Sequence, residues 1–258
     1  MTAVHGSDLR SDPGPQDDEM PLADHLQELR RRLLVFAAGA ALATIAAWFM
    51  YDRVIDLMAS PYRDYLLHHP AKDISSGNLV TTGPLEGFTT RLTISAYVGL
   101  VVAAPLGLWE LWQFLVPALR SKERRYVGSF MLAAIALFAL GVGTAVLVFP
   151  KGIAWLIGVS GSGVAPLYSP SKYFGLYAFF CLVFGAAFTY PVVLVFLELV
   201  GVVSSSQLRR WRRYAIVLII AVAAFITPTS DPFSFLAMAA PLLVFYEASI
   251  LAGRLLKH

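Results

Sequence analysis

Residues 126–150 read YVGSFMLAAIALFALGVGTAVLVFP, 25 positions without a charged side chain, and this stretch decides the fold class. A bilayer core of about 30 Å is crossed by roughly 20 apolar residues of α-helix, at 1.5 Å each. The stretch is long enough and apolar enough to cross it. We therefore predict a transmembrane helix here.

The composition of the whole chain agrees with a membrane protein. Of the 258 residues, 57% are hydrophobic and 14% are charged, and the mean hydropathy is +0.66. Soluble domains carry about 25% charged residues, so this chain has too few charges to cover a soluble body of its size. The composition argues against a water-soluble enzyme.

Five more charge-free runs accompany the first, at residues 33–51, 92–109, 173–197, 214–230 and 232–246. The last two are short, because Pro228 breaks a helix that starts at Tyr214 after about 21 Å. We predict an all-α integral membrane protein with six transmembrane helices, the last two short and joined by a tight turn. One domain, residues 20–258, would hold spans near 31–51, 89–116, 126–150, 172–199, 213–227 and 232–251.

Lysine and arginine are unevenly divided between the two predicted membrane faces. One face holds thirteen of the twenty, in segments 30–32, 120–125, 209–213 and 254–257. Cytoplasmic loops carry the excess of Lys and Arg, so both termini are predicted to be cytoplasmic. The net charge of +3 is then a topology signal rather than a sign of nucleic-acid binding, and most of these arginines are expected to anchor helix ends at lipid headgroups.

Residues 1–19 differ from the rest of the chain. They hold five acidic residues and one arginine without an apolar period, which predicts a disordered acidic extension. The single cysteine, Cys181, falls in the fourth span, which excludes a disulfide or thiolate metal site within one chain. The sequence contains no phosphate-binding or zinc motif, so no cofactor or metal is predicted.

Two acidic residues lie where basic residues dominate. Glu28 comes just before the arginines at 30–32, and Glu123 lies between Lys122 and Arg124. Two interpretations stay open. Either the adjacent bases neutralise these carboxylates, or the carboxylates accept a guanidinium from a partner, in a bidentate geometry that lysine cannot provide.

Glu110 in the second span and Glu247 in the sixth are acids at membrane depth. Such acids indicate a functional site by default, because an ionisable group is costly there. The structural alternative is that Glu110 hydrogen-bonds across helices and that Glu247, only a few residues from the cytoplasmic Arg254, snorkels to the membrane face. Glu198, near the end of the fourth span, is expected to be interfacial.

These two acids also permit a different function, that of a small proton-coupled transporter. A third class, a rhomboid-like intramembrane serine protease, is suggested by GVSG at 158–161. Its serine would need a histidine base at membrane depth, and none of the five histidines falls in a predicted span. We attribute the GVSG match to chance.

Several short motifs follow one another in order along the chain. They are LADHLQELRRRL at 22–33, TGPLEGF at 82–88, AP at 104–105, WQFLVPAL at 112–119, ERR at 123–125, FP at 149–150 and ITPTSDPFS at 226–234. Together they resemble the TatC family, the multispan receptor subunit of twin-arginine protein translocases. The resemblance extends from about residue 21 to residue 254, and its specificity comes from the order and spacing of the motifs.

The resemblance implies a receptor that catalyses no covalent reaction and uses no cofactor. It would bind the paired arginines in signal peptides of folded proteins, work with the single-span partners TatA and TatB, and draw on the proton-motive force. The location would be the bacterial cytoplasmic membrane, and the receptor complex would contain more than one copy. The positions implied for signal-peptide binding are Glu28, Glu123, Phe114, His25 and Arg124.

The same resemblance implies roles for other positions of the chain. The intramembrane or partner-binding polar residues would be Glu110, Thr189, Asp231 and Glu247, and the periplasmic cap would contain Pro84 and Glu86. The chain departs from the family in span four, where Thr189 replaces a frequent carboxylate, and in span six, where Phe235 replaces a frequent polar residue. Glu110 or a hydroxyl would then have to supply the polar group of the membrane interior.

Overall fold

The computed structural model describes residues 22–68, 83–115, 127–159, 169–227 and 231–256. All regular structure within these residues is α-helical, which confirms the predicted fold class. The helices are α1 (Leu22–Phe49), α2 (Tyr51–His68), α3 (Glu86–Leu115), α4 (Val127–Val159), α5 (Pro170–Val200), α6 (Ser205–Ile226) and α7 (Pro232–Leu256).

Among the described residues, α1, α3, α4, α5 and α7 are long and apolar enough to cross a membrane. Helix α6 does not qualify, because four arginines occupy the first half of its 22 residues. The six-span count and the cytoplasmic position of the termini therefore stay predictions. The acidic extension at 1–19 lies outside the described residues.

Two helices extend further than the sequence pattern suggests. Helix α4 continues through Pro150 to Val159, although FP at 149–150 is predicted to end the span. Proline removes one backbone donor, and the packing here is tight enough to keep the helix, since Phe149 is fully buried and stacks on Tyr177 at 4.4 Å between ring centroids. Helix α2 is an 18-residue helix that follows α1 after one residue and extends beyond the end of the first charge-free run.

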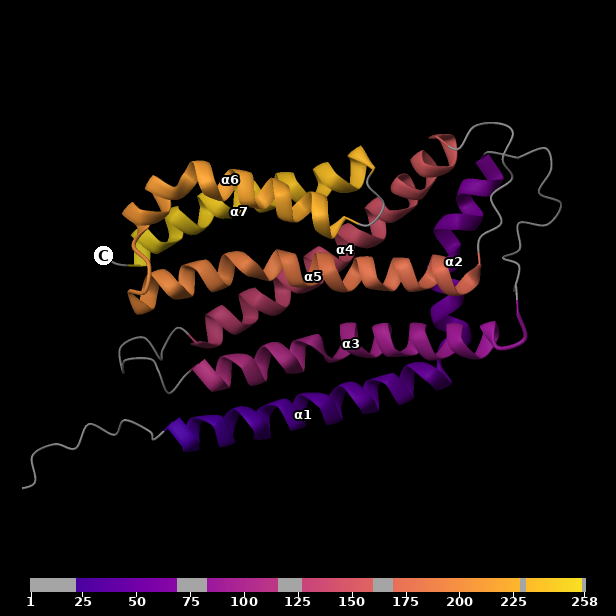
Figure 1. The fold of residues 1–258 in the computed structure, drawn as a ribbon, viewed down its shortest axis with the longest axis horizontal. Helices are drawn as coiled ribbons and strands as arrows, with labels where there is room; N and C mark the ends of the chain where they lie inside the picture. Colours follow the sequence, from indigo (N-terminus) through magenta and orange to yellow (C-terminus); the bar gives the residue numbers. More distant parts are fainter. Residues whose placement is uncertain (1–21, 69–82, 116–126, 160–168, 228–230, 257–258) are drawn as a thin grey trace, which may run out of the picture.

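Helix α5 forms the centre of the molecule and packs against α3, α4 and α7. Its aromatic side chains Phe180, Phe184 and Phe188 are buried in the main apolar core. On one side of α5 lies the pair of α1 and α3, and on the other the pair of α6 and α7 (Figure 1). This arrangement separates two charged regions, one on each pair.

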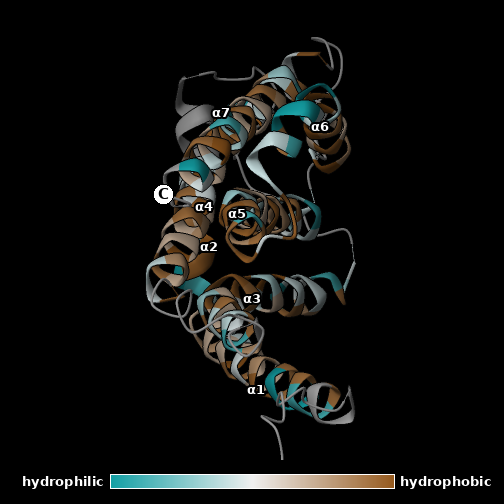
Figure 2. Cartoon of the chain, turned by 90° about the vertical axis from the view of Figure 1, so that its left-hand side faces the viewer, coloured by the Kyte–Doolittle hydropathy of each residue, from teal (hydrophilic) through white to brown (hydrophobic). Residues whose placement is uncertain are grey.

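Both charged regions lie at the same end of the molecule. The starts of α1, α4 and α6 and the ends of α3, α5 and α7 gather there (Figure 1). Figure 2 looks onto this end, where hydrophilic residues colour the near ends of helices whose remaining length is hydrophobic. It is the end that the distribution of Lys and Arg predicts to face the cytoplasm.

Candidate functional site

Arg32 of α1 forms ion pairs with two glutamates. Its Nη2 and Nε donate to Glu28 Oε1 at 2.6 and 3.0 Å, and its Nη1 donates to Glu110 Oε2 at 3.0 Å. The three side chains are between 16% and 22% exposed. Two carboxylates around one guanidinium leave one negative charge in excess. We call these three residues the acidic clasp.

The clasp depends on how α1 and α3 pack together. Glu28 and Arg32 are one helical turn apart, with the acid on the N-terminal side, which is the favourable order for such a pair. Glu110 comes from α3, which packs along α1. A β-carbon at Gly99 of α3 would lie 2.6 Å from the backbone nitrogen of Thr44, so only glycine permits this close approach.

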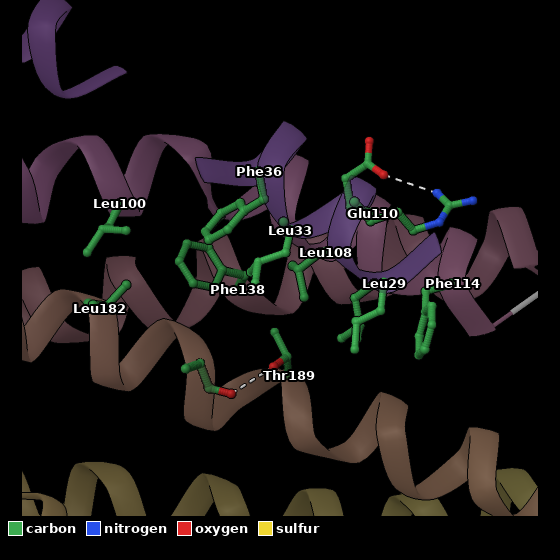
Figure 3. A pocket seen from close by; sticks show the side chains of 15 residues that line it. Leu29, Leu33, Phe36, Leu100, Leu108, Glu110, Phe114, Phe138, Leu182 and Thr189 are labelled. Atoms are coloured by element: carbon green, nitrogen blue, oxygen red, sulfur yellow. Dashed lines mark hydrogen bonds and ion pairs between the residues drawn. The ribbon is translucent and has the colours of Figure 1, made fainter. Parts of the chain in front are cut away.

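An apolar cavity of about 390 Å³ opens beside the clasp, between α1, α3, α4 and α5. Arg32, Glu110, Phe114 and Thr189 contribute to its lining, and the rest is mainly leucine, phenylalanine and alanine. Figure 3 shows Glu110, Phe114 and Thr189 around this space, with Glu110 at one side of it. An apolar cavity with an acidic side suits a ligand in which a cationic group adjoins an apolar segment.

Arg32 binds Glu28, which is the contact that the first interpretation of this acid expects, and the second interpretation stays a prediction. The hydrogen bond across helices that the sequence permits for Glu110 is also present. Each acid nevertheless uses only one oxygen. Within the described residues, Glu28 Oε2 and Glu110 Oε1 accept no hydrogen bond, so each keeps an acceptor for another donor.

Thr189 faces the same cavity as Glu110, from helix α5. Its hydroxyl donates to the Ala186 carbonyl oxygen at 2.7 Å, within its own helix. A hydroxyl bonded in this way still has lone pairs that can accept a hydrogen bond. The two groups named as substitutes for the missing span-four carboxylate therefore line one cavity.

Glu247 of α7 lies in the second charged region. Its Oε2 accepts a hydrogen bond from Arg212 Nη2 of α6 at 2.6 Å, and the two side chains are 48% and 49% exposed. The base that binds Glu247 is Arg212 of α6, although Arg254 is nearer in sequence. The reason is the neighbouring helix, since α6 packs along α7 and brings Arg212 closer than a residue two turns away on α7 itself.

Three other predicted site residues, Asp231, Glu86 and Pro84, lie away from the clasp. Asp231 is buried and its Oδ1 accepts the backbone N–H of Ser234 at 2.7 Å, which caps the start of α7. Glu86, the first residue of α3, accepts a hydrogen bond from the Ser169 hydroxyl just before α5. Pro84 is exposed ahead of α3. Glu86 and Pro84 thus lie at the end opposite the clasp (Figure 1).

The remaining predicted signal-peptide residues are Glu123, Arg124 and the side chain of His25. All three lie outside the described part of the chain. Among the site residues that are described, the cavity brings together Glu110, Phe114 and Thr189, and the clasp adds Glu28.

Sequence reasoning missed Glu198. The sequence suggests an interfacial position, but the side chain is fully buried, with one oxygen bonded to Ser205 and Oε1 without a partner in the described residues. Gly201, in the left-handed conformation at φ 83°, ends α5 and lets α6 fold back, while Gly253 of α7 leaves space for the carboxylate. In the sequence, Gly201 and Gly253 are the residues that could have indicated the burial of Glu198.

The fold and these charged side chains define a multi-pass membrane protein with paired acidic and basic groups at one end. The family model that matches the chain is the Sec-independent protein translocase protein (TatC), over residues 24–241. The chain belongs to this family.

Individual relatives agree with the family assignment. The TatC protein of Frankia casuarinae is 35% identical over 246 residues, which cover 92% of this chain but only 66% of the relative. The TatC protein of Xylanimonas cellulosilytica is 33% identical over 250 residues, covering 94% of this chain and 88% of that protein. A crystal structure of the twin arginine translocase receptor TatC is 32% identical, with a TM-score of 0.73, and the match covers 91% of this chain and 100% of that one.

Proposed function

We propose that the protein is the signal-peptide receptor and core subunit of a twin-arginine translocase, which exports folded proteins across the bacterial cytoplasmic membrane. One observation carries the proposal. The acidic clasp holds two carboxylates and one guanidinium beside an apolar cavity, at the end of the molecule predicted to face the cytoplasm. The crystal structure of similar fold is itself described as a twin arginine translocase receptor.

The clasp has the chemistry to accept a guanidinium from a peptide. Its surplus negative charge attracts a cation, and Arg32 already holds both acids in place. The second oxygens of Glu28 and Glu110 accept hydrogen bonds from one arginine of the pair, and Glu123 accepts the other. Arginine is favoured over lysine, because its planar fork presents several N–H donors in fixed directions and can donate to two acceptor oxygens at once.

The finer features of the proposal come from family membership. The protein catalyses no covalent reaction, binds no cofactor and draws on the proton-motive force. It assembles with TatA and TatB and with further copies of itself, and both termini are cytoplasmic. His25, Phe114 and Arg124 complete the peptide site, while Thr189, Asp231 and Glu247 are polar contacts for partner helices. Pro84 and Glu86 belong to a periplasmic cap.

The pairing of the deeper acids favours the receptor over a proton-coupled transporter. The transporter hypothesis rested on Glu110 and Glu247 as acids available for protonation in the membrane. Glu110 is bound to Arg32 and Glu247 to Arg212. Each of the two acids is therefore held in an ion pair with another helix of the chain, which is a structural contact that the receptor hypothesis accommodates.

Site-specific photocrosslinking tests the proposal. A crosslinking amino acid replaces Glu28 or Glu123 in membranes that contain the whole translocase, and a signal peptide carrying Arg-Arg or Lys-Lys is added. We expect labelling with Arg-Arg and a sharp loss with Lys-Lys. The matched control is a crosslinker at Glu86, at the opposite end, where neither peptide should be labelled. Equal labelling by both peptides at Glu28 and Glu123 would contradict the proposal.

A further inference from the structure

A second cavity, of about 630 Å³, lies between the start of α6 and the end of α7. Its charged lining consists of Arg209 and Arg212 from α6 and Glu247 and Arg254 from α7. Three guanidinium groups face one carboxylate, so the cavity carries two positive charges in excess. We call it the basic cavity.

The local structure explains why these charges meet. Gly201 ends α5, and Ser204 starts α6 three residues later with a capping box that includes Gln207. Arg209 and Arg212 then fall in the first two turns of α6, on one face, because they are three residues apart. On α7, Glu247 and Arg254 are seven residues apart and also share a face.

The two helices are fixed in register at this point. Tyr246 of α7 donates its hydroxyl hydrogen to the Leu208 carbonyl oxygen of α6 at 2.8 Å. Leu208, Tyr246 and Ile250 form a small buried apolar cluster, and Ile250 also lines the cavity. The arginines therefore project from two helices that are bonded and packed to each other at this point.

Only one of the three arginines is neutralised within the described residues. Arg212 pairs with Glu247 at 2.6 Å, which holds its guanidinium in one place. Arg209 and Arg254 are exposed and form no ion pair with any described residue. Anchoring at the membrane surface explains an isolated arginine, but it does not explain a cavity with two unpaired ones converging on it.

The remaining lining of the cavity is apolar. Val244 and Leu251 of α7 belong to it, and they are 65% and 59% exposed. Figure 2 shows the hydrophilic residues gathered at the near end of α6, beside the near end of α7. A ligand that fills this cavity has a compact anionic group next to a long apolar one.

We propose that the basic cavity is a binding site for an anionic glycerophospholipid from the membrane leaflet at this end of the molecule. The phosphate oxygens accept hydrogen bonds from Arg209 and Arg254, and an acyl chain runs past Leu251 and Val244. Arginine binds phosphate through two parallel N–H donors, and basic pockets between transmembrane helices recognise such headgroups. The exposed apolar side chains favour a lipid over a free phosphate ion.

Native mass spectrometry of the purified full chain, in micelles containing phosphatidylglycerol or phosphatidylcholine, tests this site. We expect one phosphatidylglycerol to stay bound in preference to phosphatidylcholine. The Arg209→Gln/Arg254→Gln variant should bind it about 30-fold less tightly. The matched control is Arg210→Gln/Arg213→Gln, which removes the same charge from α6 outside the cavity and should retain the lipid.

Every outcome of these measurements either supports or overturns the lipid site. Equal losses in the two variants would mean general charge attraction and would overturn the proposal, as would unchanged lipid binding in both. Displacement of the lipid by inorganic phosphate at the same concentration would overturn the lipid assignment. If the Arg209→Gln/Arg254→Gln variant fails to fold, Glu247→Gln serves instead. It removes the one negative charge of the cavity and should strengthen phosphatidylglycerol binding, whereas weaker or unchanged binding would count against the site.

Discussion

The acidic clasp and the basic cavity both contain an arginine bound to a glutamate at 2.6 Å, at the same end of the molecule. Their surroundings differ. In the clasp a second acid, Glu110, shares Arg32, and the side chains are about one-fifth exposed. In the basic cavity Arg209 and Arg254 join Arg212, and the paired side chains are about half exposed.

The surplus charge, rather than the ion pair, sets what each region attracts. The clasp keeps one excess negative charge and lies beside an apolar cavity, so it suits a cationic peptide. The basic cavity keeps two excess positive charges and suits a phosphate. The two pairs also differ in energy, because a half-exposed pair gains little from attraction in water whereas a largely buried one is costly to break.

The largest expected effect is on peptide binding at the clasp. The Glu28→Gln/Glu110→Gln variant changes the clasp from one negative to one positive charge. Hydrogen bonds to charged groups contribute about 1.5–3 kcal/mol each, so we expect about 100-fold weaker binding of an Arg-Arg signal peptide. Fluorescence anisotropy with a labelled peptide and the protein in nanodiscs measures the dissociation constant.

The control for this variant is Glu86→Gln/Glu247→Gln, which removes two acids outside the clasp. We expect it to bind the peptide as tightly as the unmodified protein does. Similar weakening in both double variants would mean that overall charge, and not the clasp, attracts the peptide. The difference in charge between the acidic clasp and the basic cavity would then not explain where the peptide binds.

The second prediction concerns the stability of the clasp. The Arg32→Gln variant leaves Glu28 and Glu110, two largely buried carboxylates, without their base. Removal of one partner from a buried pair costs about 3–5 kcal/mol, and the partial exposure here lowers our expectation to about 2 kcal/mol. Thermal unfolding in detergent measures the change. The Arg32→Lys variant keeps the positive charge but loses the planar guanidinium, so it should recover only part of the lost stability.

Much of the fold follows from the sequence, because charge-free runs of sufficient length have few alternatives to a membrane helix. The pairing of charges does not follow, since it depends on the register between helices. The spacing of Glu28 and Arg32 makes their pair predictable, but Glu110 reaches Arg32 because α3 packs closely along α1, as at Gly99. In the same way, Arg212 rather than Arg254 binds Glu247 because α6 folds back along α7.

Glu198 marks the limit of sequence reasoning for the candidate sites. Hydropathy places it near a helix end, where an acid normally reaches water. The tight turn at Gly201 and the small residue Gly253 enclose it instead, and neither effect can be read from the properties of Glu198 itself. It is also the acid at this end that has no arginine partner among the described residues.

Glu198 gives a third prediction, which concerns its close contact with Gly253 of α7. A β-carbon at Gly253 would collide with its carboxylate, so Gly253→Ala should lower the free energy of unfolding by about 1–2 kcal/mol, as overpacking does. The double variant Glu198→Ala/Gly253→Ala removes the collision and should be more stable than the sum of the single effects predicts. Additive effects in the double-mutant cycle would show that the two residues do not contact each other.

The smallest effect is expected at the basic cavity. The Arg212→Gln variant breaks a pair that is about half exposed, and exposed pairs contribute about 0.2–1 kcal/mol. The loss should be further reduced because Arg209 and Arg254, which line the same cavity, remain to attract Glu247. Thermal unfolding under the conditions used for Arg32→Gln, repeated at high salt, measures the difference in stability.

Salt should abolish most of the small effect at Arg212 and little of the larger effect at Arg32, because screening acts mainly on exposed charges. Equal destabilisation of the two variants would show that burial does not distinguish the two pairs.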